Sequence, residues 1–202
     1  TVTFASGSSL GSIGDYAFRQ SGLTTISLPA SVTSMGTHTF RSCSLLKTVT
    51  FASGSSLGNI GNYAFYQSGL TTISLPASVT SIGTYTFNGC SSLKTVTFAS
   101  GSSLGSIGDY AFYYSGLTTI SLPASVTSIA DHAFYKCSLL KTVTFASGSL
   151  LGSIGNQAFQ QSGLTTISLP ASVTSIADNA FYVCPSLKTV TFASGSSLGS
   201  IG

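Results

Sequence analysis

Charge is scarce in this sequence of 202 residues: only 5% of the residues are charged, and neither Glu nor Trp occurs. Soluble surfaces usually carry about 25–35% charged residues, so we expect Ser and Thr hydroxyl groups to face the water instead. The net charge of +3 comes from cations too sparse to neutralise a phosphate backbone, which argues against nucleic-acid binding. No apolar run approaches the roughly 18 residues of a membrane-spanning helix, so no membrane insertion is expected.

A repeat of 47 residues runs through the whole chain. The string TVTFASGS marks its start, at Thr1, Thr48, Thr95, Thr142 and Thr189. Each repeat is a doublet of two similar units of 24 and 23 residues, which differ by short loop insertions. Such repetition is typical of solenoids, in which each coil buries its apolar residues against its neighbours. Residues 1–202 are therefore predicted to form a single solenoid. Because the chain begins on strand residues and stops part-way round a coil, we expect it to be an excerpt of a longer array.

Each unit predicts one short strand and one turn. Apolar and hydroxyl residues alternate in Leu23–Leu28 and in Leu46–Phe51, a period typical of a strand with one buried face. Pro29 follows the first of these strands and suits the end of a ladder, because it has no amide hydrogen to donate. Segments such as Asp15–Phe18 are expected to form a single helical or 3₁₀ turn, capped by Asp, Asn or Thr.

The expected fold is an α/β-type repeat solenoid. It has a single parallel β-sheet on one face and the short helical or 3₁₀ turns on the other. Ladders of apolar residues, including one of Phe, form its continuous core. Nine strands are expected, beginning near Thr1, Thr25, Thr48, Thr72, Thr95, Thr119, Thr142, Thr166 and Thr189.

The second unit of each doublet carries a more specific pattern. In one copy Leu70–Pro76 reads LTTISLP, Val79–Gly83 reads VTSIG, and a Cys follows three residues after the Phe in Phe87–Cys90. These features resemble the BspA-like class of leucine-rich repeats, over the whole chain. The first unit departs from that class, with Ser21–Gly22 near the Cys position and no Pro after the strand. The resemblance implies a leucine-rich-repeat fold in a secreted or surface-displayed microbial protein, often an adhesin for matrix proteins or cells, and supplies no catalytic residue.

One cysteine occurs in each doublet. These residues are Cys43, Cys90, Cys137 and Cys184. Two coils would separate successive cysteines by about 9.6 Å, whereas a disulfide needs Cα atoms within about 7 Å. We therefore expect reduced thiols that close the turn as small buried groups, rather than a thiol or metal ladder. No metal and no cofactor are expected.

Combinations of catalytic residue types are present but poorly placed. His38 precedes Cys43 by five residues, and His132 precedes Cys137 by five, with Asp131 beside it. A nucleophile must lie within hydrogen-bond reach of its base, yet Cys is expected to point into the core and His outward. The recurring GSSLGSIG lacks the Gly-Lys-Ser/Thr ending of a phosphate-binding loop. The chain is therefore not expected to be an enzyme.

Differences between copies are concentrated in two windows, residues 15–20 and 37–42 with their equivalents, which hold all nine tyrosines. Stacked Tyr rings are large, stiff and amphipathic, so an exposed stripe of them is a candidate recognition surface. The alternative is a convex surface that tolerates change because nothing contacts it. The candidate stripe consists of Tyr16, His38, Tyr63, Tyr66, Tyr85, Tyr110, Tyr113, His132 and Tyr135.

The predicted sheet offers a second candidate surface, which differs little between copies. Its outward hydroxyl side chains are those of Thr48, Thr50, Thr72, Ser74, Thr95, Thr97, Thr119 and Ser121. Such an array suits ordered water on ice, packing against a neighbouring chain or O-linked sugar, or it reflects only the β-propensity of Thr. Four lysines begin alternate strands, and their spacing of about one Debye length predicts a role in solubility rather than an anion site. They are Lys47, Lys94, Lys141 and Lys188.

The sequence thus predicts a non-enzymatic extracellular or cell-surface repeat protein with an adhesive or protein-recognition surface. Its partner would be a protein, a cell-surface or matrix ligand, or copies of itself. The alternative function is structural, either a self-assembling filament or coat element or an ice-binding hydroxyl array.

Overall fold

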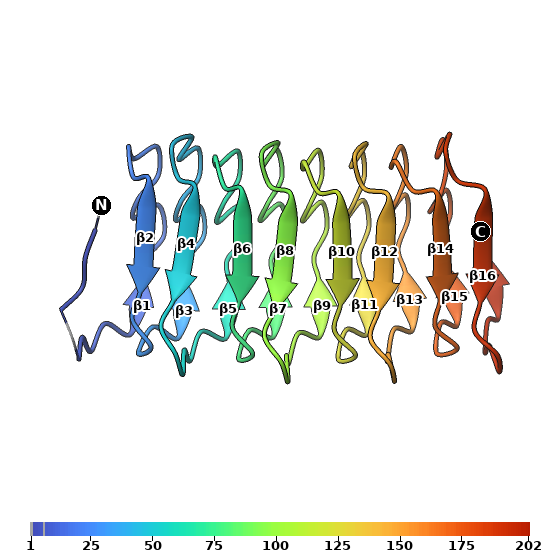
Figure 1. Cartoon of the computed structure of the whole chain (residues 1–202), viewed down its shortest axis with the longest axis horizontal. Coiled ribbons are helices and arrows are strands. Elements are labelled where there is room, and N and C mark those ends of the chain that lie inside the picture. The colour runs from blue at the N-terminus through green and yellow to red at the C-terminus, as the bar shows by residue number, and fades with distance from the viewer. Residues whose placement is uncertain (1, 6) are drawn as a thin grey trace.

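Four-residue strands line one face of the protein. The structure is a computed structural model and describes residues 2–5 and 7–202. The four-residue strands lie side by side along an elongated body (Figure 1). These strands are β2 (Thr25–Leu28), β4 (Thr48–Phe51), β6 (Thr72–Leu75), β8 (Thr95–Phe98), β10 (Thr119–Leu122), β12 (Thr142–Phe145), β14 (Thr166–Leu169) and β16 (Thr189–Phe192). The strand expected near Thr1 begins outside the described residues, and Val2 forms an isolated parallel bridge with Ile26.

A parallel sheet of nine strands is present, as predicted, but other residues form it. Its two-residue strands are β1 (Ser12–Ile13), β3 (Ser34–Met35), β5 (Asn59–Ile60), β7 (Ser81–Ile82), β9 (Ser106–Ile107), β11 (Ser128–Ile129), β13 (Ser153–Ile154), β15 (Ser175–Ile176) and β17 (Ser200–Ile201). They pair in chain order, one strand per coil. Strands this short show no alternation of their own, so sequence periodicity did not reveal them.

The four-residue strands do not form the single sheet that the sequence predicted. They pair within doublets, as β2–β4, β6–β8, β10–β12 and β14–β16. Between doublets, Thr71 donates its amide hydrogen to the Lys47 carbonyl oxygen at 3.3 Å, and two later junctions repeat this contact. An alternating pattern specifies which side chains face the core, but not which neighbouring backbones come close enough to form a ladder.

The prediction of helical or 3₁₀ turns is wrong, because no helix occurs among the described residues. In residues 15–20, the amides of Tyr16, Phe18 and Gln20 donate to carbonyl oxygens of the next coil at 2.8–2.9 Å. The intervening amides bond three residues back within the same turn. All amides of a helix point along its own axis, so a helix lying across the stack would offer none to the neighbouring coil.

The predicted caps act between coils rather than within one turn. An Asp15 carboxylate oxygen accepts the Thr37 amide hydrogen of the next coil, with an N–O distance of 2.6 Å. Asp131 accepts the Asn156 amide in the same way at 2.7 Å. Each carboxylate therefore connects two successive turns.

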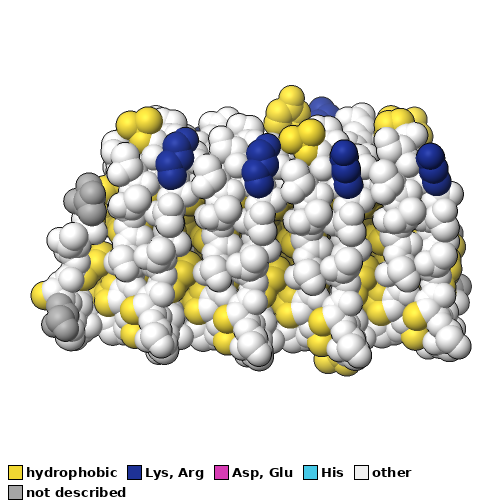
Figure 2. All heavy atoms as spheres, in the orientation of Figure 1, with side chains coloured by type: hydrophobic (Ala, Val, Ile, Leu, Met, Phe, Trp, Pro, Cys, Tyr) yellow, Lys and Arg dark blue, Asp and Glu magenta, His cyan; other side chains and the backbone are white. Residues whose placement is uncertain are grey.

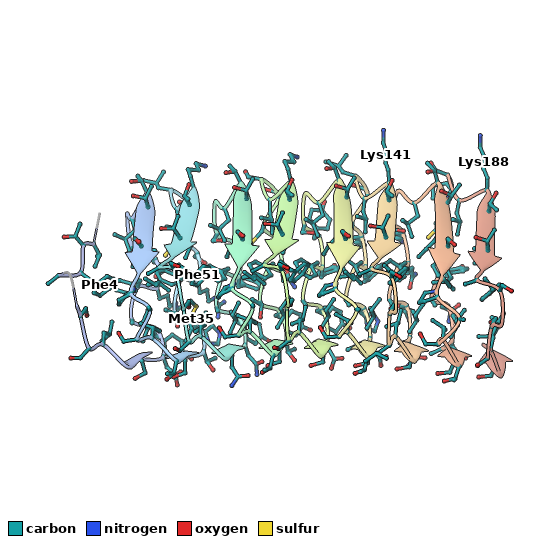
Figure 3. The ribbon with its side chains drawn as sticks, turned by 60° about the horizontal axis from the view of Figure 1, so that its bottom comes forward. Phe4, Met35, Phe51, Lys141 and Lys188 are labelled. Carbon is teal, nitrogen blue, oxygen red and sulfur yellow. The ribbon has the colours of Figure 1, made fainter. Side chains whose placement is uncertain are left out.

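The core lies between the two strand layers, where side chains fill the interior (Figure 3). A ladder of Phe rings passes through it, as the sequence predicted, and its six interior members are fully buried with centroids 5.1–5.3 Å apart. These members are Phe40, Phe65, Phe87, Phe112, Phe134 and Phe159. Since the ladder occupies one position of every coil, it holds the turn segments of successive coils at a common depth.

Candidate functional site

Six aromatic rings of the predicted stripe form one continuous stack on the turn face. Neighbouring ring centroids lie 4.3–4.8 Å apart, with interplanar angles of 3–10°. In order along the stack, these rings belong to Tyr16, His38, Tyr63, Tyr85, Tyr110 and His132. The sequence predicted an exposed stripe, but each interior ring covers its neighbours and is only half exposed. Ring edges, rather than ring faces, are thus presented to the solvent.

The backbone beneath this stack is in the left-handed region. The six stacked residues have φ angles of 54–59°, a conformation that costs a non-glycine residue about 1–2 kcal/mol. The amide of each residue donates to the next coil, for example Tyr63 to the Thr84 carbonyl oxygen at 2.9 Å. These bonds between coils hold the conformation and fix the direction of the side chain.

A second row of side chains lies three residues further along each turn. The Tyr66 ring is tilted by 53° relative to the Tyr63 ring, with centroids 5.7 Å apart, and the Arg41 guanidinium lies 4.9 Å from the Tyr66 ring centroid. The ring centroids of Tyr113 and Tyr135 lie 5.2 Å apart. All nine stripe residues are thus brought into two adjacent rows, a grouping that sequence spacing alone suggested.

Burial controls protonation in the stack. It lowers the pKa of His38, and the charges of Arg41 and Arg19 lower it further. Burial raises the pKa of Tyr85 and of Tyr110. At neutral pH the side chains of His38, Tyr85 and Tyr110 are therefore uncharged, which suits contact and hydrogen bonding rather than proton transfer.

Tyr114 was missed as a site residue, although its ring is 60% exposed. It has a φ angle of 57° and borders a groove of about 600 Å³ together with Lys136 and Leu139. A sequence signal existed: Gln20 and Gln67 occupy the equivalent places in earlier doublets, so Tyr114 is a change from a polar to a large aromatic residue.

The candidate sheet face points outward as predicted, since its hydroxyl residues are exposed or half-buried and alternate with core residues. Its rows are interrupted, however. Register pairs Thr72 with Thr95 and Ser74 with Thr97, but no ladder continues from Thr50 to the next doublet. The surface is a series of four-hydroxyl patches rather than one uninterrupted array.

The four lysines of alternate strands form a straight row along this face (Figure 2). Lys141 and Lys188 extend away from the body (Figure 3). No acidic side chain is visible in the same view (Figure 2). The face is thus weakly basic along one line and otherwise neutral.

Comparison with known proteins agrees with this architecture. Residues 11–106 and 105–202 match the family described as BspA type leucine-rich-repeat region, in six copies. The chain belongs to this BspA-type family. No match was found among curated proteins.

Several solved structures are similar to this chain. A T. pallidum leucine-rich-repeat protein is 26% identical to this BspA-type chain with a TM-score of 0.62, over 83% of this chain and 74% of that one. The pneumococcal vaccine antigen PcpA is 24% identical with a TM-score of 0.48, over 85% of this chain and 62% of that one, so this chain spans less than two thirds of its length. A leucine-rich cell surface protein from Faecalibacterium prausnitzii is 21% identical with a TM-score of 0.39, over 96% and 87%.

The BspA-type cysteines carry no disulfide among the described residues. The Cys90 thiol donates to the Phe65 carbonyl oxygen at 3.0 Å and lies 3.4 Å from the Ser68 hydroxyl oxygen. Because Cys and Ser come from alternate coils, they form one mixed ladder. His38, five residues before Cys43, is stacked between Tyr rings, while the Cys43 thiol donates to the Phe18 carbonyl oxygen at 2.9 Å. The two groups are therefore engaged in separate contacts.

Two further features of the BspA-type chain concern function. Within residues 2–5 and 7–202, no group of three or more His, Cys, Asp or Glu side chains is placed to hold a metal ion. In the same part of the chain, no helix has the length and apolar character needed to cross a membrane.

Cys90 and Cys137 are expected to resist alkylation in the native protein. Burial raises the pKa of Cys90 to about 11 and that of Cys137 to about 12, so at pH 8 both remain neutral thiols, which are poor nucleophiles. Mass spectrometry after iodoacetamide treatment, with and without denaturant, measures this. Cys184 is half-buried and serves as the internal comparison, with faster labelling. Rapid native labelling of Cys90 would contradict the burial of the ladder.

Proposed function

We propose that this chain is a non-enzymatic recognition protein that acts outside the cell or on its surface and binds a protein or matrix ligand through the aromatic stripe. The observation that carries the proposal is the ordered stack of Tyr and His edges on one face, with a second Tyr row beside it. Membership of the BspA-type leucine-rich-repeat family supports a binding role. The extracellular location rests on the family resemblance and on the scarcity of charge.

The stripe has the properties of a good contact surface. Its rings are already ordered by stacking, so binding would cost little further side-chain entropy. Tyr is enriched among residues that dominate binding energy, because it combines a large apolar area with a hydroxyl group. Hydroxyl groups of Tyr63, Tyr85 and Tyr110 would recur at intervals of one coil, which matches an extended partner lying along the solenoid.

Replacing Tyr63, Tyr85 and Tyr110 with Gln is expected to lower binding to immobilised matrix extract and to whole cells by about tenfold or more. Gln157 already occupies this position in a later coil with a φ angle of 54°, so the chain accommodates Gln there. Surface plasmon resonance and cell-binding counts measure the loss, and circular dichroism establishes that the variant is folded.

The matched control changes the other face, with Thr50→Lys and Thr97→Lys on exposed strand positions. This control should bind as the parent does. Loss of binding in the control with retention in the stripe variant would refute the proposal and assign recognition to the hydroxyl face.

Self-assembly is the second candidate function, and the paired hydroxyl patches of the strand face favour it. Few surface charges are present to repel a neighbouring copy. Light scattering over a concentration series, on the parent and on both variants, tests this. Assembly that the Thr variant abolishes would support a filament or coat element. The interruption between doublets weighs against an ice-binding array, which requires uninterrupted regularity.

A further inference from the structure

The groove beside Tyr114 breaks the repetition of the solenoid. It has a volume of about 600 Å³ and runs along the stack of coils, beside the left-handed residues that lie four positions after the stacked position of each turn. That wall consists of Tyr114, Lys136, Gln161 and Val183, with φ angles of 51–57°. The opposite wall is formed by the loops after the cysteines, including Leu139 and Pro185.

The floor of the groove is largely bare backbone. Gly116 and Gly163 lie there, each followed by a buried Leu of the core. A Cβ atom on Gly116 would overlap the Ser91 carbonyl oxygen, so only glycine lets the two coils approach this closely. The nearby Ser115 and Ser162 are buried, and their hydroxyl oxygens lie 3.4 and 3.3 Å from the Cys137 and Cys184 sulfurs. The Gly116 and Gly163 amides already donate to the Cys90 and Cys137 carbonyl oxygens, so the floor offers a close-fitting surface rather than free amide hydrogens.

The exposed apolar groups are concentrated on the walls. Tyr114 is 60% exposed, Leu139 46% and Val183 49%. The left-handed conformation of Tyr114 recurs at the equivalent position of every coil from Gln20 to Val183, and the Tyr114 amide donates to the Tyr135 carbonyl oxygen at 3.0 Å, so the backbone holds this side chain at the groove edge. Tyr, Ser and Gly together also form the typical composition of adaptable binding loops. The walls thus suit an apolar side chain of a partner.

The charge of the groove is one-sided. Its lining includes one cation, Lys136, and no Asp or Glu. The Lys136 ammonium nitrogen is held 5.2 Å from the Tyr135 ring centroid and 5.9 Å from that of Tyr113. A cation positioned in this way is complementary to a carboxylate that lies beside an apolar group.

We propose that this groove binds a short extended peptide segment of a partner protein, in which an apolar or aromatic side chain stands next to a carboxylate. The apolar side chain lies between Tyr114 and Leu139, and the carboxylate meets Lys136. The groove borders five successive coils, about 19 Å at the spacing of parallel strands, which accommodates about five extended residues. This inference rests on the proposed function in taking a protein as the ligand, but it assigns binding to residues outside the stripe.

The probes are fluorescein-labelled ten-residue peptides with Phe or Leu beside two Asp residues in Gly-Ser flanks. Matched peptides replace Asp with Asn, or the apolar residue with Ala. Fluorescence polarisation is expected to show binding of the acidic-apolar peptides alone, weakened by added salt because Lys136 contributes through its charge. Equal binding of the Asn peptides, no binding of any peptide at millimolar protein, or preferential binding of an acidic oligosaccharide would overturn the proposal.

The variants copy residues that the chain carries at equivalent places. Lys136→Ser reproduces Ser42, its equivalent in the first doublet, which has a φ angle of 57°, and Leu139→Ser reproduces Ser92. Tyr114→Ser places at the left-handed position of the first unit the residue that Ser42 carries at the corresponding position of the second unit. The double variant Tyr114→Ser, Leu139→Ser should weaken peptide binding about tenfold. Lys136→Ser should remove most of the salt dependence of peptide binding.

Leu45→Ser is the matched control, since Leu45 is 54% exposed at the same corner of another doublet. It should leave peptide affinity unchanged. Unchanged affinity in the folded Tyr114 and Leu139 variant would overturn the proposal. The two proposals can fail separately. If the stripe variant loses matrix binding and the groove variants keep both matrix and peptide binding, the proposed function stands and only the groove proposal is refuted.

Discussion

Replacing Phe112 with Ala is expected to lower the free energy of unfolding by about 3–5 kcal/mol. The ring is fully buried and stacks on Phe87 at 5.2 Å and on Phe134 at 5.1 Å. Truncation would leave a cavity that neighbouring coils cannot fill, because hydrogen bonds along the stack fix their separation. Chemical denaturation followed by circular dichroism measures the change.

Phe18 provides the matched control in the same ladder. It is half-buried and stacks on one ring, that of Phe40, at 5.2 Å. Phe18→Ala should therefore cost clearly less than Phe112→Ala. Equal losses at the two positions would show that stacking along the ladder does not determine its stability.

Gly116→Ala is expected to destabilise the protein by about 3 kcal/mol or to prevent native packing, because overpacking against fixed groups is unfavourable. The new Cβ would overlap the backbone carbonyl oxygen of Ser91, which cannot rotate away as a side chain can. The Gly116 amide also donates to the Cys90 carbonyl oxygen at 3.1 Å, so the two coils cannot separate without losing that bond. Thermal unfolding measures the loss.

Gly105→Ala tests whether the effect comes from this close approach. A Cβ at Gly105 would lie 3.7 Å from the Thr80 carbonyl oxygen, an ordinary contact. That variant should unfold at nearly the parent temperature. Equal unfolding temperatures for Gly116→Ala and Gly105→Ala would contradict the close approach of the Ser91 carbonyl oxygen to Gly116.

The sequence predicted the core better than it predicted the hydrogen bonds. Phe87 and Phe112 were recognisable as one ladder because burial follows directly from apolar periodicity. The turns were assigned as helical since Asp15 and its equivalents resemble caps, but their bonding partners lie in the next coil, 22 or 25 residues away. Local propensity contains no information about such partners. The same limit explains why strands such as Ser81–Ile82 were missed.

For the candidate site, residue type and recurrence were enough to group the stripe. Tyr63, Tyr85 and Tyr110 recur once per coil, and a solenoid places such residues side by side. The groove at Tyr114 depends instead on how far two loops stand apart, which follows from backbone conformation rather than from composition. The sequence indicated the groove only through the change from Gln20 and Gln67 to Tyr114 at one repeat position.

The paired arrangement of the four-residue strands has a mechanical consequence. On the face of the short strands, every junction between coils has the same ladder, from β1 to β17. On the opposite face, firm ladders alternate with junctions such as that of β4 and β6, where no ladder forms and two backbone bonds lie before the strands, from Thr71 to Lys47 at 3.3 Å and from Gly69 to Cys43 at 3.0 Å. Bending that separates coils on the face of the four-residue strands would therefore concentrate at every other junction. The solenoid would then flex between doublets, while the two coils within each doublet move together.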